Sequence, residues 1–117
     1  MHELSIAQNI IQILNSTVEQ NRLGLVDKIH LKIGLLCNVM IESLNFSYNS
    51  IVENTPLQNS TLEIEILPIK ITCNDCGEIN TTYDFIFFCP ACNSSAISVI
   101  SGDEMIISSV QLNEESE

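Results

Sequence analysis

The sequence predicts an α+β fold: a small mixed three-stranded sheet with two helices, and an inserted β module that carries four cysteines. Three observations support this prediction. Apolar residues recur at helical spacing in two segments, they alternate with polar residues in the segments around the second helix, and two Cys-x-x-Cys pairs lie before the last strand. A length of 117 residues suits one domain, or one domain with a minor module.

Two helices are predicted from the spacing of apolar residues. The first covers residues 4–18, where Ser5 with Gln8 has the form of a capping box, and residues 21–24 are predicted to end it. The second starts at Ile41, and Asn54-Thr55-Pro56 stops it. The buried stripes are predicted to be Leu4, Ala7, Ile10, Ile11, Leu14 and Val18 in the first helix, and Ile41, Leu44, Tyr48, Ile51 and Val52 in the second.

Strands are predicted on both sides of the second helix. In residues 28–33 apolar side chains alternate with lysines and His30, which places His30 on the solvated face and not in a ligand set. In residues 62–66 they alternate with glutamates. These two strands are predicted to pair in parallel through a right-handed crossover.

The remaining strands surround the cysteine pairs. The alternation slips by one residue at Leu67-Pro68, which marks the entry to the cysteine module. A short strand at 97–100 and a final strand at 105–112 follow, and the acidic tail 113–117 is expected to fray. The predicted domains are residues 1–67 with 104–117, and an inserted module of residues 68–103.

The four paired cysteines predict a closed metal site of the zinc-ribbon type. Cys73 and Cys76 are separated from Cys89 and Cys92 by a spacer of twelve residues, which lets two knuckles point four sulfurs at one ion. Four thiolates leave no open position, so the site is structural. Two disulfides are the alternative, and the odd cysteine, Cys37, is predicted to be a small buried apolar residue.

Charge narrows the classes of partner. The chain has 15 acidic residues against four Lys and Arg, a formal charge of −11, and no basic residue lies between the first and last cysteine of the two pairs. Nucleic acid is therefore excluded as a partner, while a basic protein or a metal cation suits this surface. Tyr83, Phe85, Phe87 and Phe88 are predicted to pack around the thiolates rather than to form a binding patch.

The composition also bears on localisation. The sequence has no apolar run of membrane-spanning length and no leader of the secretory kind, so membrane insertion and secretion are not expected. Thiols kept for a metal suit the reducing cytosol. We therefore expect a cytoplasmic protein.

The amino terminus offers a second metal-binding pattern, Met1-His2-Glu3. The Met1 amine, the backbone nitrogen of His2 and its imidazole can close fused chelate rings around one ion, with the Glu3 carboxylate or another backbone nitrogen completing a plane. Such nitrogen ligation favours Ni(II) or Cu(II) over Zn(II). Spacing alone leaves open a solvent-exposed His2 and a Glu3 that acts only near the helix amino end.

These residues together resemble the HypA/HybF nickel maturation factors. The resemblance runs from Met1-His2-Glu3-Leu4-Ser5 through Lys32-Ile33-Gly34 and Leu62-Glu63-Ile64-Glu65 to Phe88-Cys89-Pro90 and Cys92, and covers essentially the whole chain. It implies a nickel metallochaperone, not an enzyme, that works with a GTPase to load the large subunit of NiFe hydrogenase, and in some organisms supports urease.

The resemblance also implies the roles of individual residues. His2 is the nickel ligand, with Glu3 and Met1 in support, and Ni(II) is cargo rather than a resident cofactor. Cys73, Cys76, Cys89 and Cys92 hold a structural Zn(II).

The residues alone also allow two other functions for the cysteine pairs. The cysteine pairs also resemble rubredoxin knuckles, in which four thiolates hold one iron for electron transfer, and the ligand set does not separate iron from zinc. A zinc ribbon that serves only as a protein-interaction module is the other. Enzymatic activity has no support, because the sequence shows no nucleophile–base spacing and no phosphate loop.

Overall fold

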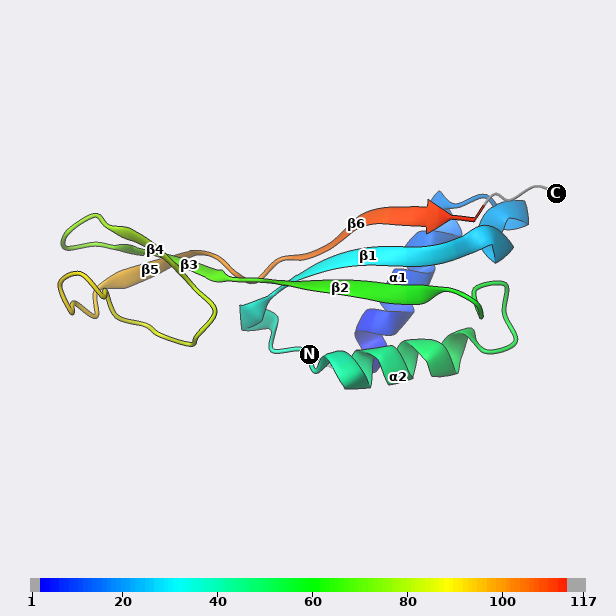
Figure 1. Cartoon of the computed structure of the whole chain (residues 1–117), viewed down its shortest axis with the longest axis horizontal. Helices are drawn as coiled ribbons and strands as arrows, with labels where there is room; N and C mark the ends of the chain where they lie inside the picture. Colours follow the sequence, from blue (N-terminus) through cyan, green and yellow to red (C-terminus); the bar gives the residue numbers. More distant parts are fainter. Residues whose placement is uncertain (1–2, 114–117) are drawn as a thin grey trace. The chain divides into compact units, whose positions relative to one another are not determined.

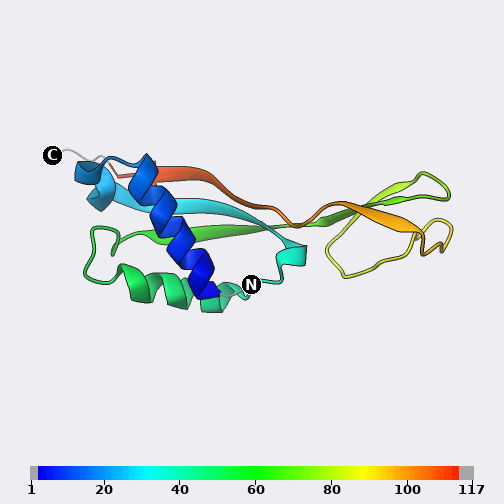
Figure 2. The same ribbon diagram turned by 180° about the vertical axis from the view of Figure 1, so that it is seen from behind.

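The computed structural model describes residues 3–113 and has the predicted α+β fold (Figures 1 and 2). No helix in this part of the chain is long and apolar enough to cross a membrane. The helices are α1 (Glu3–Thr17), η1 (Gln20–Leu25), η2 (Leu35–Cys37) and α2 (Ile41–Val52), where η marks a 3-10 helix. The strands are β1 (Val26–Gly34), β2 (Thr61–Leu67), β3 (Ile69–Cys73), β4 (Ile79–Thr82), β5 (Ile97–Ser101) and β6 (Met105–Leu112).

The described chain divides into two compact units. The first comprises residues 3–31, 39–65 and 106–113, and the second comprises residues 32–38 and 66–105. The sequence-based domain prediction placed residues 32–38 with the first of these, whereas here they group with the cysteine-bearing segment. That the two parts are separate domains stays a prediction.

The first sheet has the order β2-β1-β6, with β1 in the middle. β1 and β2 run in the same direction in Figure 1, and at their starts the Thr61 hydroxyl donates to the Asp27 carbonyl at 3.5 Å. β6 returns in the opposite direction, because Asn113 N–H donates to Leu25 O at 2.7 Å and the Ser108 hydroxyl donates to His30 O at 3.1 Å. The predicted mixed sheet, with a parallel pair around α2, is confirmed.

The core of the first unit lies where α1, α2 and the strands meet. α1 packs against α2, and both bury one stripe of apolar side chains, as their periodicity predicts. The capping-box prediction is wrong, because α1 already includes Glu3 and Ser5 therefore lies inside the helix. The predicted stripes differ from the observed ones in detail, since Leu4 and Ile41 are exposed and Ile6 is buried. The core residues of the two helices are Ile6, Ala7, Ile10, Leu14, Leu44, Tyr48 and Val52.

The start of α2 is tied to the start of α1 through Glu3. The N-cap residue of α2, Met40, has no side-chain cap of its own, and its N–H donates to Glu3 Oε2 at 3.0 Å. This hydrogen bond satisfies a donor at the α2 amino end, where a carboxylate is favoured by the helix dipole. Glu3 therefore fixes the first turn of α1 against its neighbouring helix.

The second unit contains an antiparallel sheet with the order β4-β3-β5. Ile71 in the central strand lies opposite Asn80 of β4 and Val99 of β5. The break predicted at Pro68 is confirmed, since β2 ends at Leu67 and β3 begins at Ile69 with its apolar side chains buried. β4 was not predicted, because its sequence Ile-Asn-Thr-Thr is too short and polar to show alternation.

Two glycines allow the segments of the second unit to cross at very short range. Gly34 N–H donates to Glu104 O at 2.7 Å, and Leu36 N–H donates to Gly102 O at 2.8 Å. A Cβ atom on Gly34 would lie 2.1 Å from the Gly102 carbonyl oxygen, and Gly102 itself has a φ of 129°. Beside this crossing the Cys37 thiol lies 3.4 Å from Asp103 O, so this cysteine is half-buried and hydrogen-bonded rather than a fully buried apolar residue.

Gly34→Ala is expected to destabilise the fold by about 3 kcal/mol, because the added methyl group collides with backbone that no rotamer change can move. Urea unfolding of the zinc-loaded protein would measure the change. Gly24→Ala is the matched control, since a Cβ there meets nothing closer than the Pro56 carbonyl at 4.0 Å. An equally stable Gly34 variant would contradict the close crossing.

Candidate metal centre

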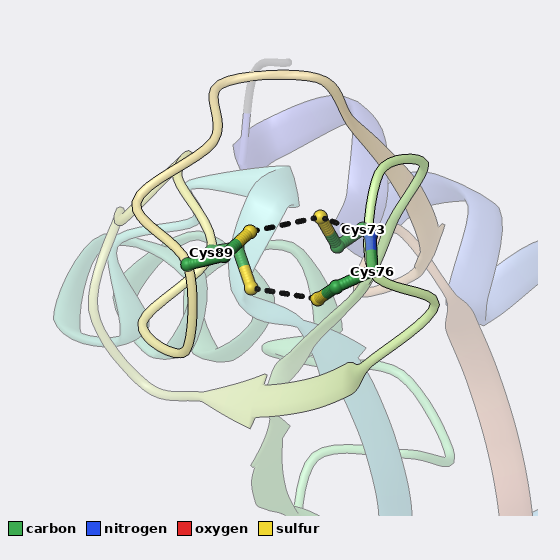
Figure 3. Close-up of side chains that lie close together, drawn as sticks. Cys73, Cys76 and Cys89 are labelled. Carbon is green, nitrogen blue, oxygen red and sulfur yellow. Dashed lines mark hydrogen bonds between the residues drawn. The ribbon is translucent and has the colours of Figure 1, made fainter.

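The structure brings the four paired cysteines together at one end of the β4-β3-β5 sheet (Figure 3). Their sulfur atoms all lie within 4.8 Å of one another. The Cys73 and Cys92 sulfurs are 3.6 Å apart, and so are those of Cys76 and Cys89. These separations exceed an S–S bond of about 2.05 Å, so the alternative of two disulfides is not what the structure contains.

Each pair lies on a tight backbone turn. In the first, Gly77 N–H donates to Cys73 O at 2.9 Å, and Gly77 has a φ of 78°, a conformation that glycine adopts without steric cost. In the second, Asn93 N–H donates to Cys89 O at 2.7 Å, and Asn93 has a φ of 63°. The turns aim both sulfurs of each pair inward, as Figure 3 shows for Cys73 and Cys76.

Hydrogen bonds within the cluster shift the pKa values of Cys73 and Cys92 in opposite directions. The Cys76 N–H donates to Cys73 Sγ at 3.4 Å and is the main reason that the pKa of Cys73 falls to about 7. A backbone hydrogen bond near Ser94 lowers the pKa of Cys92, but the Cys73 sulfur and burial outweigh it and raise this pKa to about 12. The lowered pKa of Cys73 favours its thiolate, which is the form of a cysteine that binds a metal cation.

The cluster fits a tetrahedral ion. With metal–sulfur bonds of about 2.3 Å, a tetrahedron of four thiolates has sulfur–sulfur separations of roughly 3.8 Å. The two measured separations of 3.6 Å are close to this value, and Cys73 and Cys89 are buried while Cys76 and Cys92 are exposed. An ion held by these four sulfurs would replace shared protons and close the site, which makes it a structural centre.

A side-chain hydrogen bond joins the two turns outside the sulfurs. The Ser94 hydroxyl donates to Asp75 Oδ2 at 2.5 Å, and Ala96 N–H donates to Ser94 Oγ at 3.0 Å. Asp75 lies between the cysteines of the first pair, and Ser94 lies two residues after Cys92. This contact was not predicted, because an Asp and a Ser in loops carry no signal in the sequence that they pair.

Asp75→Ala is expected to speed the release of zinc to a chelator by about tenfold, because it removes the side-chain link between the turns. Stopped-flow transfer to a coloured chelator would measure the rate. Glu78→Ala is the control, since this exposed carboxylate in the same segment forms no hydrogen bond among the described residues. Equal release rates in both variants would mean that the link does not hold the metal.

The prediction for the aromatic residues near the cluster is wrong. Tyr83, Phe85, Phe87 and Phe88 were expected to pack around the thiolates, but their side chains are 65%, 54%, 45% and 44% exposed. The segment that bears them has no helix or strand and leaves β4 before Cys89. Hydrophobicity in the sequence identifies these residues as apolar, but it does not show whether another part of the chain covers them.

Of the predicted amino-terminal site, Met1 and His2 lie outside the described residues, as does the tail 114–117. Glu3 is described, and its carboxylate is engaged by the Met40 N–H. Together with Glu42 and Phe46 it lines an open hollow beside the first turns of α1 and α2. His30 lies on the predicted strand, β1, is half-buried, and does not belong to the cluster of four cysteines.

Comparison with known proteins identifies the family to which the chain belongs. Residues 1–112 match the family model described as "Hydrogenase/urease nickel incorporation, metallochaperone, hypA". The chain belongs to the HypA family. A HypA hydrogenase maturation factor of Chloroflexus aurantiacus is 36% identical over 106 residues, 90% of this chain and 93% of the relative. The HypA of Aquifex aeolicus is 32% identical over 112 residues, 96% and 97% of the two chains.

The fold agrees with the family. The solution structure of the Ni metallochaperone HypA from Helicobacter pylori has a TM-score of 0.66 at 19% identity, and the match covers 98% of this chain and 100% of that one. As a HypA family member, the chain is a nickel metallochaperone for hydrogenase maturation with a four-cysteine, zinc-like site, and it is not an enzyme.

Proposed function

We propose that this chain carries Ni(II) on its amino terminus and delivers it to the large subunit of NiFe hydrogenase in the cytoplasm, together with a maturation GTPase. The observation that carries this proposal is the family match, which begins at residue 1 and therefore includes Met1-His2-Glu3. The Met1 amine, the His2 imidazole and intervening backbone nitrogen supply the ligands that favour Ni(II). Urease maturation proteins are further candidate partners.

Glu3 supports the nickel site by position. Its carboxylate accepts the Met40 N–H, so the residue that follows His2 is held at the start of α1 against α2. A carrier must bind nickel and also release it, which a site with few ligands on a chain end permits. Glu3 would fix the residue that follows the proposed ligands Met1 and His2, without itself having to be replaced when nickel is released.

The second part of the proposal is that Cys73, Cys76, Cys89 and Cys92 hold Zn(II), which stabilises the fold around them. The sulfur separations of 3.6 Å suit a tetrahedral ion. Iron in the same ligands is the alternative. An absorption spectrum of the protein as purified separates them, because a ferric tetrathiolate is red and the zinc form is colourless.

Calorimetry with zinc-loaded protein tests the nickel site directly. The protein with its native, untagged amino terminus is expected to bind nickel, and a matched protein with one extra residue before Met1 is expected not to, because the extension removes the terminal amine from the chelate. Equal nickel binding by both forms would place the metal elsewhere. Absence of binding by both would leave the zinc-stabilised interaction domain as the function.

A further inference from the structure

The segment between β4 and the second cysteine pair presents an unusual concentration of exposed aromatic side chains. We define residues 83–88 as the aromatic loop; it is the segment that turns from green to yellow after β4 in Figure 1. It contains four of the six aromatic residues of the chain, all between 44% and 65% exposed. Burial of one such side chain is worth about 1.5–3 kcal/mol, so the loop holds apolar surface that another molecule can cover.

The aromatic loop is fixed at both ends. On one side Thr82 pairs with Ile69 of β3, and the Thr82 hydroxyl accepts the Asp84 N–H at 3.0 Å. On the other side Cys89 is fully buried in the sulfur cluster. Within the loop, Ile86 N–H donates to Asp84 O at 2.9 Å. Anchored aromatic side chains lose little conformational entropy when they are covered, which is why such residues dominate the energetics of protein interfaces.

Charge selects the kind of partner. The sequence contains no Lys, Arg or His after Lys70, whereas Asp75, Glu78 and Asp84 lie in or beside the cysteine turns and the loop. Four thiolates on a divalent ion add roughly two further negative charges. Acidic proteins, nucleic acids and anionic membranes would be repelled, as would a second copy of this chain with its charge of −11. A cationic protein surface with apolar side chains is the complement.

We propose that the aromatic loop is a docking surface for a nickel-maturation partner, and that the partner meets it with an apolar patch flanked by Lys or Arg. This inference rests on the proposed function, which supplies the class of partner. It adds a place of contact on the cysteine-bearing unit, apart from the amino-terminal residues that carry the metal. Tyr83 and Phe85, the two most exposed aromatic side chains of the loop, would act as anchors, and Asp84 between them would pair with a cation.

The test measures binding of the zinc-loaded full chain to two purified proteins of the same organism, the maturation GTPase and the hydrogenase large-subunit precursor. The Tyr83→Ser, Phe85→Ser double variant is expected to bind one of them at least about tenfold more weakly. Asp84→Asn is expected to reduce the salt dependence of the same binding. Ile13→Gln is the matched control, because Ile13 is an exposed apolar residue on α1.

Three results would overturn the proposal: binding of both proteins within twofold of wild type by the double variant, equal loss in the Ile13 control, or no binding of either protein by wild type. Zinc content and nickel calorimetry on the same samples separate the causes. A variant that keeps both metals but loses the partner supports docking. Wild-type protein that binds nickel but neither partner rejects this surface while leaving the nickel carrier intact, and wild-type protein without nickel binding rejects the proposed function itself.

Discussion

Cys89→Ser is expected to abolish stoichiometric zinc binding and to unfold the β4-β3-β5 sheet. Cys89 is fully buried, its sulfur lies 3.6 Å from that of Cys76, and its N–H donates to Ser94 O at 2.8 Å. The small sheet buries few apolar side chains, of which Ile69 and Ile71 are the chief ones, so metal binding must supply much of its folding energy. For comparable structural zinc sites that energy is roughly 10–16 kcal/mol.

Amide NMR spectra and zinc stoichiometry would measure this effect. The signals of residues 69–101 should lose their dispersion, while those of α1 and α2, which have a separate buried core, should persist. Cys37→Ser is the control, because Cys37 belongs to the same unit but lies outside the sulfur cluster, and a serine hydroxyl can replace its hydrogen bonds. A folded, zinc-loaded Cys89 variant would mean that three thiolates suffice.

His2→Ala is expected to weaken nickel binding by at least about a hundredfold, because the variant loses the imidazole that closes the chelate. The free energy of unfolding should change by less than about 0.5 kcal/mol, because the proposed role of His2 is to bind the cargo and not to stabilise the fold. The chain has only two histidines, so His30→Gln is a natural control. Nickel calorimetry beside urea unfolding would measure both quantities.

The two histidine variants also separate the competing readings of the amino terminus. Loss of nickel in the His2 variant alone supports the terminal site. Loss of nickel binding in the His30 variant alone would indicate that nickel binds at the first sheet, where His30 lines the same hollow as Glu63 and Glu65. Nickel binding kept by both variants would exclude imidazole ligation altogether.

Much of the fold could be predicted because its long elements carry clear periodicity. Both α-helices and the strands β1, β2, β5 and β6 were found close to their observed ranges, and the break at Pro68 followed from a change of phase. The features that were not predicted depend on more than the local pattern of apolar and polar residues. β4 is set by pairing with β3, α1 already includes Glu3 and so begins ahead of Ser5, and η1 occupies residues that were expected only to end a helix.

The candidate site was predictable to the same limit. The spacing of the cysteines predicts the sulfur cluster, because each Cys-x-x-Cys pair places two ligands on one short turn. The contacts around it were not predictable, since Asp75 with Ser94 and Glu3 with Met40 join residues 19 and 37 positions apart. The exposure of the aromatic loop depends on whether other parts of the folded chain cover it, and this cannot be predicted from the local sequence.

The division of the chain limits how its parts can be exchanged between relatives. The cysteine-bearing unit is built from two stretches, residues 32–38 and 66–105, so it is not one continuous cassette. A chimera that replaced only residues 66–105 would set a foreign turn at Gly102 against the original Gly34, where there is no room for a side chain. Recombination within this lineage would therefore have to transfer both stretches together, or keep a glycine at both ends of the crossing.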